Sequence, residues 1–285
     1  MKAAASGLLI LAAALLAACA GKVEVDAPEF AIHVVDPGNL PGRVVAYTFP
    51  NGAWPRFYVG VDVHTTWSAG DRQDVPAPLP HGRFPISIET RPSPDGSAVA
   101  TLHIGKPVPG IPGCPELAGE MTFEASGRVR SSTLAVPADA PPAVRPVLDA
   151  LLGRLSRLLI PLPETNIGEG ARWRVARPLG GAEEIVSCRL ARLHVDEARI
   201  TSTLVRQAKG LPATVALHAR HGDVEAVYRA GSATGQATLE IDLRTFYLGG
   251  EETITATKDY EVVGDGGGAH QVVRTRVRAR TSIAP

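Results

Sequence analysis

From Arg43 onward the chain alternates short apolar runs with turn-forming residues, and only one helical pattern interrupts them. The separators include Pro50-Asn51-Gly52, Ser93-Pro94-Asp95-Gly96 and Ser126-Gly127. Strands at this spacing, without helices between them, are typical of antiparallel sheets. The chain is therefore predicted to be mainly β. The expected strands before the helix are Val44–Phe49, Phe57–Trp67, Phe84–Glu89, Ala98–Ile104, Gly119–Ala125 and Val129–Val136.

The carboxy-terminal third has the clearest alternation of apolar and polar residues. Residues 237–243 predict one strand, Thr253–Val263 a second and Gln271–Thr281 a third. Leu248-Gly249-Gly250-Glu251 is expected to form the first hairpin turn, and the glycines of 264–268 the next. These three strands predict an antiparallel meander.

Pairing about those turns places Glu240 opposite Asp259, and Asp259 opposite Arg274. In this register Lys258 falls on the apolar face beside Ile241. Either the register slips by one residue, or that face lines a cavity with room for a polar group.

The last strand carries an arginine at every second position, so its four guanidinium groups share one face. Such a row could bind carboxylates or phosphates. A solvated strand face, balanced by acidic residues on neighbouring strands, is the preferred interpretation. The four are Arg274, Arg276, Arg278 and Arg280.

Residues 142–159 predict one amphipathic helix, because leucines recur there at helical spacing. Pro141-Pro142 suits its start, and Pro161 prevents it from continuing. Leu148, Leu151, Leu152 and Leu155 are expected to face inward, with Arg145, Asp149, Arg154 and Arg157 on the other side. Packing on the sheet is preferred over a membrane-surface helix, because the stripe has no Trp, Phe or Lys. The predicted fold is a curved antiparallel sheet or half-barrel, or two sheets, covered by this helix.

The amino terminus has the pattern of a secretory signal, with Lys2, an apolar run and small residues before Cys19. Residues 1–18 are the expected signal peptide, 19–42 a tether and 43–285 the β domain. The alternative is an uncleaved anchor helix over residues 3–20. Leu16-Ala17-Ala18-Cys19 resembles the lipobox of bacterial lipoproteins. That resemblance implies a diacylglycerol on Cys19, an acyl chain such as palmitate on the new amino terminus, and therefore a membrane anchor. Ala20, where an aspartate would retain the protein at the inner membrane, implies the outer membrane facing the periplasm.

Two further cysteines, Cys114 and Cys188, form an even pair in an oxidising compartment. They are either a disulfide or two buried free thiols. The charge is balanced, with 29 basic and 29 acidic residues, so nothing indicates nucleic acid as a partner.

No pattern in the chain predicts catalysis, a metal site or a cofactor. The eight histidines do not cluster, and the closest two, His218 and His221, would point to opposite faces of a strand. Gly231–Gly235 lacks the serine position of a nucleophile elbow. The glycines of 264–268 lie between strands, which is not the setting of a phosphate-binding loop. The protein is therefore predicted not to be an enzyme.

The segment Leu162–Trp173, in which a helix ends in Leu-Pro before a glycine and a tryptophan, resembles a family of uncharacterised bacterial lipoproteins. Gly231–Asp242 and the glycine pair after it add to the resemblance, which spans residues 43–282. It implies a mainly β secreted domain of unknown function with no catalytic residues. The expected architecture is also similar to the lipoprotein carriers of the LolA and LolB kind.

Two functions remain open. The protein binds an apolar ligand or lipid between sheet and helix, or it is a structural envelope protein with a filled core that docks another protein. An apolar cavity would favour the first. The expected pocket residues are Leu148, Leu151, Leu152, Leu155, Leu239, Leu243, Tyr260 and Lys258.

Overall fold

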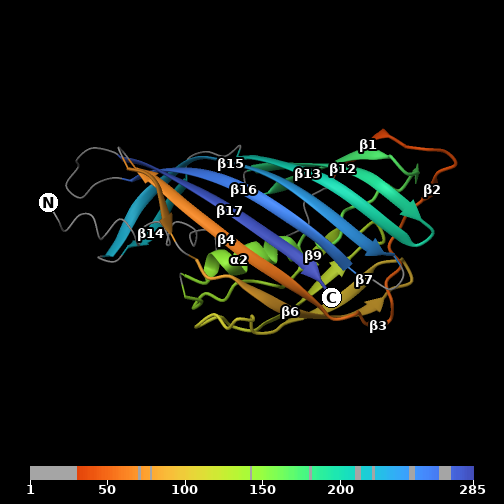
Figure 1. Cartoon of the computed structure of the whole chain (residues 1–285), viewed down its shortest axis with the longest axis horizontal. Helices are drawn as coiled ribbons and strands as arrows, with labels where there is room; N and C mark the ends of the chain where they lie inside the picture. Colours follow the sequence, from red (N-terminus) through yellow and green to blue (C-terminus); the bar gives the residue numbers. More distant parts are fainter. Residues whose placement is uncertain are drawn as a thin grey trace.

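The structure is a computed structural model of the chain, and it describes residues 31–69, 72–77, 79–141, 143–179, 182–208, 213–219, 222–243, 248–262 and 271–285. Strands dominate the described residues, with one short helix between β9 and β10 (Figure 1). The strands are β1 (Ala31–Asp36), β2 (Arg43–Val44), β3 (Gly52–Ala53), β4 (Phe57–Ala69), β5 (Arg72–Ala77), β6 (Gly82–Pro92), β7 (Ala98–Ile104), β8 (Leu117–Phe123), β9 (Val129–Ser132), β10 (Asn166–Ile167), β11 (Arg172–Leu179), β12 (Ala182–His194), β13 (Glu197–Ala208), β14 (Ala213–Ala219), β15 (Gly222–Asp242), β16 (Leu248–Val262) and β17 (Gln271–Ala284).

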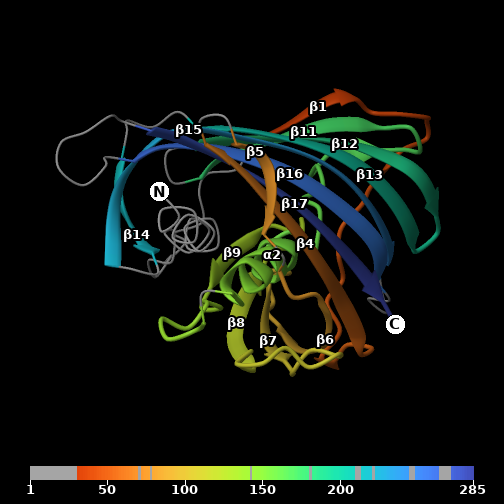
Figure 2. The ribbon, with the colours of Figure 1, turned by 60° about the vertical axis from the view of Figure 1, so that its left-hand side comes forward.

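One large antiparallel sheet runs in the order β1-β11-β12-β13-β15-β16-β17-β4-β6-β7-β8-β9. Outside this order, β14 pairs with β15, β3 with β6 and β5 with β4, and β2 and β10 form a second, two-stranded sheet. The large sheet curves strongly but does not close, and helix α2 (Arg145–Leu155) lies inside the curve (Figure 2). This confirms the predicted fold class, a curved antiparallel sheet covered by one helix.

Strand β17 joins the two parts of the sheet. It pairs with β16 on one side and with β4, from the other end of the chain, on the other. The alternation of buried and exposed residues along β4 shows why a sheet forms here: Val59, Val61 and Val63 face the core, and the residues between them face outward. The predicted period of two is confirmed in this strand.

Helix α2 is shorter than the predicted 142–159. It begins at Arg145 and ends at Leu155, and the chain then continues in tighter turns in which Arg157 and Leu158 bond to carbonyls three residues back. Leu148, Leu151 and Leu155 are at most 1% exposed, as predicted, and Leu152 is half-buried against the same core. The helix makes its main contacts with β4 and β17.

Among the described residues, no helix has the length and apolarity needed to span a bilayer.

The predicted pairing of β15 with β16 is wrong. Ile241 pairs with Leu248, so Gly249 and Gly250 lie in β16 and not in a turn. Glu240 faces Gly249, and Asp259 faces Ala230. The physical reason is visible at Gly250, whose φ is +148° and where a Cβ would stand 2.1 Å from the Thr238 carbonyl oxygen. This glycine allows a close approach of two strands and does not form a turn.

The predicted pairing of β16 with β17 is confirmed. Asp259 faces Arg274, and both nitrogens of the guanidinium fork bond its carboxylate, Nε at 2.7 Å and Nη2 at 2.9 Å. Arg280 donates a single hydrogen bond, from Nη2, to the Glu251 carboxylate on the neighbouring strand at 2.9 Å. These pairs favour the interpretation of the arginine row as a solvated, charge-balanced outer face. The 264–268 turn lies outside the described residues.

One further expectation is corrected, and one open alternative is decided. Residues 31–36 were expected in the tether, but they form β1 and pair with β11 at one edge of the sheet. Of the two alternatives for Cys114 and Cys188, a disulfide or buried free thiols, the structure has the second: both cysteines are free and buried. Cys188 lies on β12, opposite Trp173 of β11, and Cys114 lies in the loop before β8. Cys19 lies outside the described residues.

Candidate functional site: a charged cavity beside helix α2

A small cavity of about 50 Å³ lies where the end of helix α2 meets the concave face of the sheet. Its walls come from the last turn of α2 and the segment after it, and from β11, β12, β13, β15 and β16. Aliphatic side chains form most of the wall. They are Val129, Leu159, Ile160, Val175, Val186, Leu204, Leu239 and Ile254.

The segment after the helix is held in place by two buried hydrogen bonds. The Tyr47 hydroxyl donates to the Ile160 carbonyl at 2.9 Å, and the Trp173 indole Nε1 donates to the Pro161 carbonyl at 2.8 Å. Both carbonyls belong to residues that line the cavity. One side of the cavity is therefore fixed to β11 and to the amino-terminal part of the domain. Burial raises the pKa of the Tyr47 phenol, so this group stays a donor.

A row of charged residues crosses three strands at one end of the cavity. Arg177 on β11 faces Glu184 on β12, which in turn faces Arg206 on β13. The Glu184 side chain is 0% exposed and accepts hydrogen bonds from both arginines. Burial alone would raise the pKa of Glu184, but the charges of Arg177 and Arg206 hold it below its ordinary value. Glu184 is therefore ionised at neutral pH.

A second ion pair joins the end of the helix to the sheet. Arg157 bonds Glu252 on β16 through Nε and Nη2, each at 2.9 Å from one carboxylate oxygen. This is the bidentate arrangement that matches a guanidinium to a carboxylate. Burial would raise the pKa of Glu252, but the charge and hydrogen bonds of Arg157 keep it below its ordinary value. Both carboxylates of the cavity are thus already paired.

Arg154 is a third arginine at the cavity, and it has no carboxylate of its own. It is 2% exposed, and its Nη1 donates to the Arg157 carbonyl at 2.7 Å. Its Nε and Nη2 are buried and have no hydrogen-bond partner among the described residues. Burial lowers the pKa of Arg154 to about 10, although the negative charge of Glu252 acts in the opposite direction. The guanidinium therefore stays charged at neutral pH, and its Nε–Nη2 edge, called the unused edge below, makes no hydrogen bond to the described residues.

The sequence did not predict this charged cluster, which consists of Arg154, Arg157, Arg177, Glu184, Arg206 and Glu252. Arg154 and Arg157 were expected on the solvent side of the helix, and that expectation is wrong, because the last turn of α2 brings them against the sheet. One signal could have found part of it. A hairpin centred on the Gly180-Gly181 pair of the sequence places Arg177 opposite Glu184.

Of the eight pocket residues expected from the sequence, Leu239 is the one that lines this cavity among the described residues. The α2 leucines pack in the core, Leu243 bonds through its backbone to Asp196 and Thr48, and Tyr260 packs edge-on against Tyr228 with ring centroids 5.7 Å apart.

Lys258 is half-buried, and it faces Gly231 and Thr275 in place of Ile241. Its charge interacts with Asp149 on α2, so it lies on the concave side of the sheet. Lys258 is therefore on the concave face, but its neighbours there are not the apolar ones that the sequence indicated.

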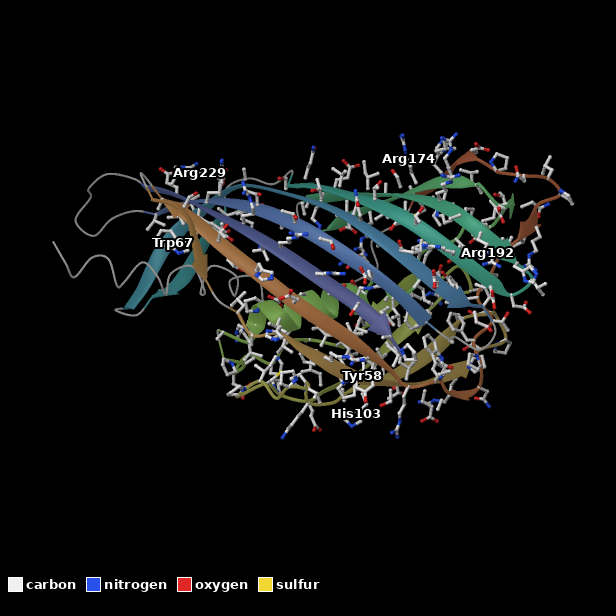
Figure 3. The ribbon with its side chains drawn as sticks, in the orientation of Figure 1. Tyr58, Trp67, His103, Arg174, Arg192 and Arg229 are labelled. Carbon is white, nitrogen blue, oxygen red and sulfur yellow. The ribbon has the colours of Figure 1, made fainter. Side chains whose placement is uncertain are left out.

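The outer face of the sheet is polar and highly charged, and Arg174, Arg192 and Arg229 project from it (Figure 3). Arg229 is paired with Glu261 on the next strand. A shallow groove of about 620 Å³ lies on this face over β11, β12, β13, β15 and β16. Within the part of the chain that the structure describes, no three His, Cys, Asp or Glu side chains gather as a metal site requires.

No known family matches this chain, and no curated protein is significantly similar to it in sequence. The family resemblance drawn from residues 162–173 therefore stays a prediction.

Proposed function

We propose that this protein is a lipid-anchored, non-catalytic protein of the bacterial cell envelope that binds an apolar ligand between its curved sheet and helix α2. The lipobox resemblance supports the anchor at Cys19 and a position on the outer membrane facing the periplasm. The membrane and the apolar ligand are its proposed partners.

The observation that carries the ligand proposal is the aliphatic cavity at the end of the covering helix. Eight branched aliphatic side chains and a proline surround it, including Leu204 and Leu239, which are at most 5% exposed. Such walls are typical of ligand sites. Helix α2 makes its main contacts with β4 and β17, and the cavity lies beside it, between the segment after the helix and the strands from β11 to β16.

The cavity volume is about 50 Å³, whereas ordinary ligand sites measure several hundred Å³. A ligand larger than this space must therefore extend out of it, past the half-buried residues of its wall. The small volume also favours the second candidate, a structural or protein-docking envelope protein with a filled core. Binding of an apolar probe distinguishes the two.

The test uses the purified full chain and N-phenyl-1-naphthylamine, an uncharged apolar probe whose fluorescence rises on burial. We expect saturable binding that is lost in Ala237→Leu, because residue 237 lines the cavity on the concave face. Thr238→Leu is the matched control, since the next residue of β15 points to the outer face. No saturable binding by the wild type, or equal binding by both variants, contradicts the proposal. Mass spectrometry of organic extracts of the purified protein then identifies the natural ligand.

A further inference from the structure

The unused edge of Arg154 is the feature of the cavity that the protein itself does not explain. A buried guanidinium with two unpaired N–H groups is costly, because each group loses its water without gaining a partner. Among the described residues of the charged cluster, the four arginines Arg154, Arg157, Arg177 and Arg206 face two carboxylates, and Arg177, Arg206 and Arg157 already bond to these. The cavity therefore carries surplus positive charge beside Arg154.

The geometry of the unused edge specifies what it fits. Nε and Nη2 lie on the same side of a guanidinium and present two parallel donors. Arg157 uses this same pair of atoms to bind both oxygens of Glu252. Arg154 thus offers a second site of the same kind, and a carboxylate is the group that matches it.

We propose that Nε–H and Nη2–H of Arg154 bind the carboxylate of a long-chain fatty acid, whose hydrocarbon chain lies along the aliphatic wall of the cavity. This inference rests on the proposed function and names the ligand class. The space of about 50 Å³ that Arg154 lines matches the size of a carboxylate group and is too small for the chain. Nε and Nη2 each expose less than 1 Å², so the carboxylate reaches them by displacing the atoms that cover them. The chain leaves past Val186 and Ile254, two half-buried residues of the wall.

The binding test compares palmitate with hexadecanol, its uncharged counterpart, by displacement of N-phenyl-1-naphthylamine from the full chain. A charge-assisted pair predicts that palmitate binds the wild type roughly tenfold more tightly. Arg154→Met, which keeps the length of the side chain, should remove this preference and leave hexadecanol affinity unchanged. Arg276→Met, an exposed arginine on the outer face of the sheet, should behave as the wild type.

A second measurement covers the case in which Arg154→Met does not fold. The carboxyl carbon of ¹³C-labelled palmitate reports its own titration by NMR. Bound to the wild type, it should titrate at lower pH than in detergent micelles, because a neighbouring guanidinium favours the carboxylate. A bound carboxyl that titrates as in micelles, or higher, overturns the inference.

The outcomes separate the two proposals. If hexadecanol binds and palmitate binds no better, the cavity takes an apolar ligand, and Arg154 is satisfied by water alone. If the preference for palmitate persists in Arg154→Met, the carboxylate binds elsewhere and the inference is wrong. If neither compound binds, the proposed function fails and the inference fails with it.

Discussion

Arg157 bonds both oxygens of Glu252, and this pair ties the chain just after helix α2 to strand β16. The side chains are 15% and 7% exposed, so the pair is largely removed from water. Breaking such a pair leaves one buried charge without a partner, which costs far more than losing a surface salt bridge.

We therefore expect Arg157→Met to destabilise the fold by about 3–5 kcal/mol, because Glu252 would stay buried and unpaired. The double variant Arg157→Met with Glu252→Leu should recover most of that loss. Urea unfolding of the single and double variants measures both values. Equal stabilities for all the proteins would show that the pair contributes nothing.

Stability should fall with acid because of Glu184 and Glu252. Their pKa values in the folded protein lie below the ordinary 4.5, so folding favours their ionised forms. Their contribution is complete above pH 4.5 and is lost as the pH falls through the lower folded pKa. Urea midpoints at about pH 7 and about pH 3 should therefore differ less in Glu184→Gln than in the wild type. Glu240→Gln, at an exposed carboxylate, should keep the wild-type difference.

Leu151→Ala should cost about 2–5 kcal/mol of unfolding free energy, since this 0% exposed side chain fills the space between α2 and the sheet. Leu152→Ala is the matched control on the same turn of the helix. Its side chain is half-buried, so its loss should be smaller. Equal losses in urea unfolding would mean that α2 packs in another orientation.

Cys114 and Cys188 should both react with iodoacetamide in denaturant without prior reduction, because neither is in a disulfide. In the folded protein both should react slowly. Burial raises the pKa of Cys188 to about 12 and also raises that of Cys114, so little reactive thiolate forms. Peptide mapping after alkylation measures each site. Recovery of a peptide pair linked through sulfur would contradict the structure.

Cys19→Ser should accumulate as an unprocessed precursor, because the lipid is attached through sulfur. Intact mass spectrometry of the membrane fraction compares it with the wild type. A variant that matures to the wild-type mass would show that the lipobox interpretation is wrong.

The sequence was informative wherever one face of an element is buried. The alternation in β4 and β7 and the leucine stripe of α2 follow directly from burial on one side, and each prediction of a strand or helix there was confirmed. The register in which β15 and β16 pair was harder to predict. Gly249-Gly250 has the composition of a turn, but Gly250 is needed where β16 passes close to Thr238. Close approach and turning both favour glycine, and sequence does not separate them.

The candidate site could not be predicted because its charges come from four separate segments. Arg154 and Arg157 lie near the end of α2, Arg177 and Glu184 on the paired strands β11 and β12, Arg206 on β13, and Glu252 on β16. Only the register of the sheet brings them together. A pattern of polar residues on a helix normally indicates solvent, and here the last turn of the helix meets the sheet.

The position of β17 also limits the order in which the protein can assemble. Residues 271–284 supply the only strand between β16 and β4 in the sheet as described, so its two parts have no direct pairing with each other. Contacts between strands so distant in the chain form late, because the long intervening loop must first be closed. A chain emerging from the ribosome, or crossing a membrane amino terminus first, thus holds two incomplete sheets until its final strand arrives. Exposure to proteases, and dependence on chaperones, should be greatest in that interval.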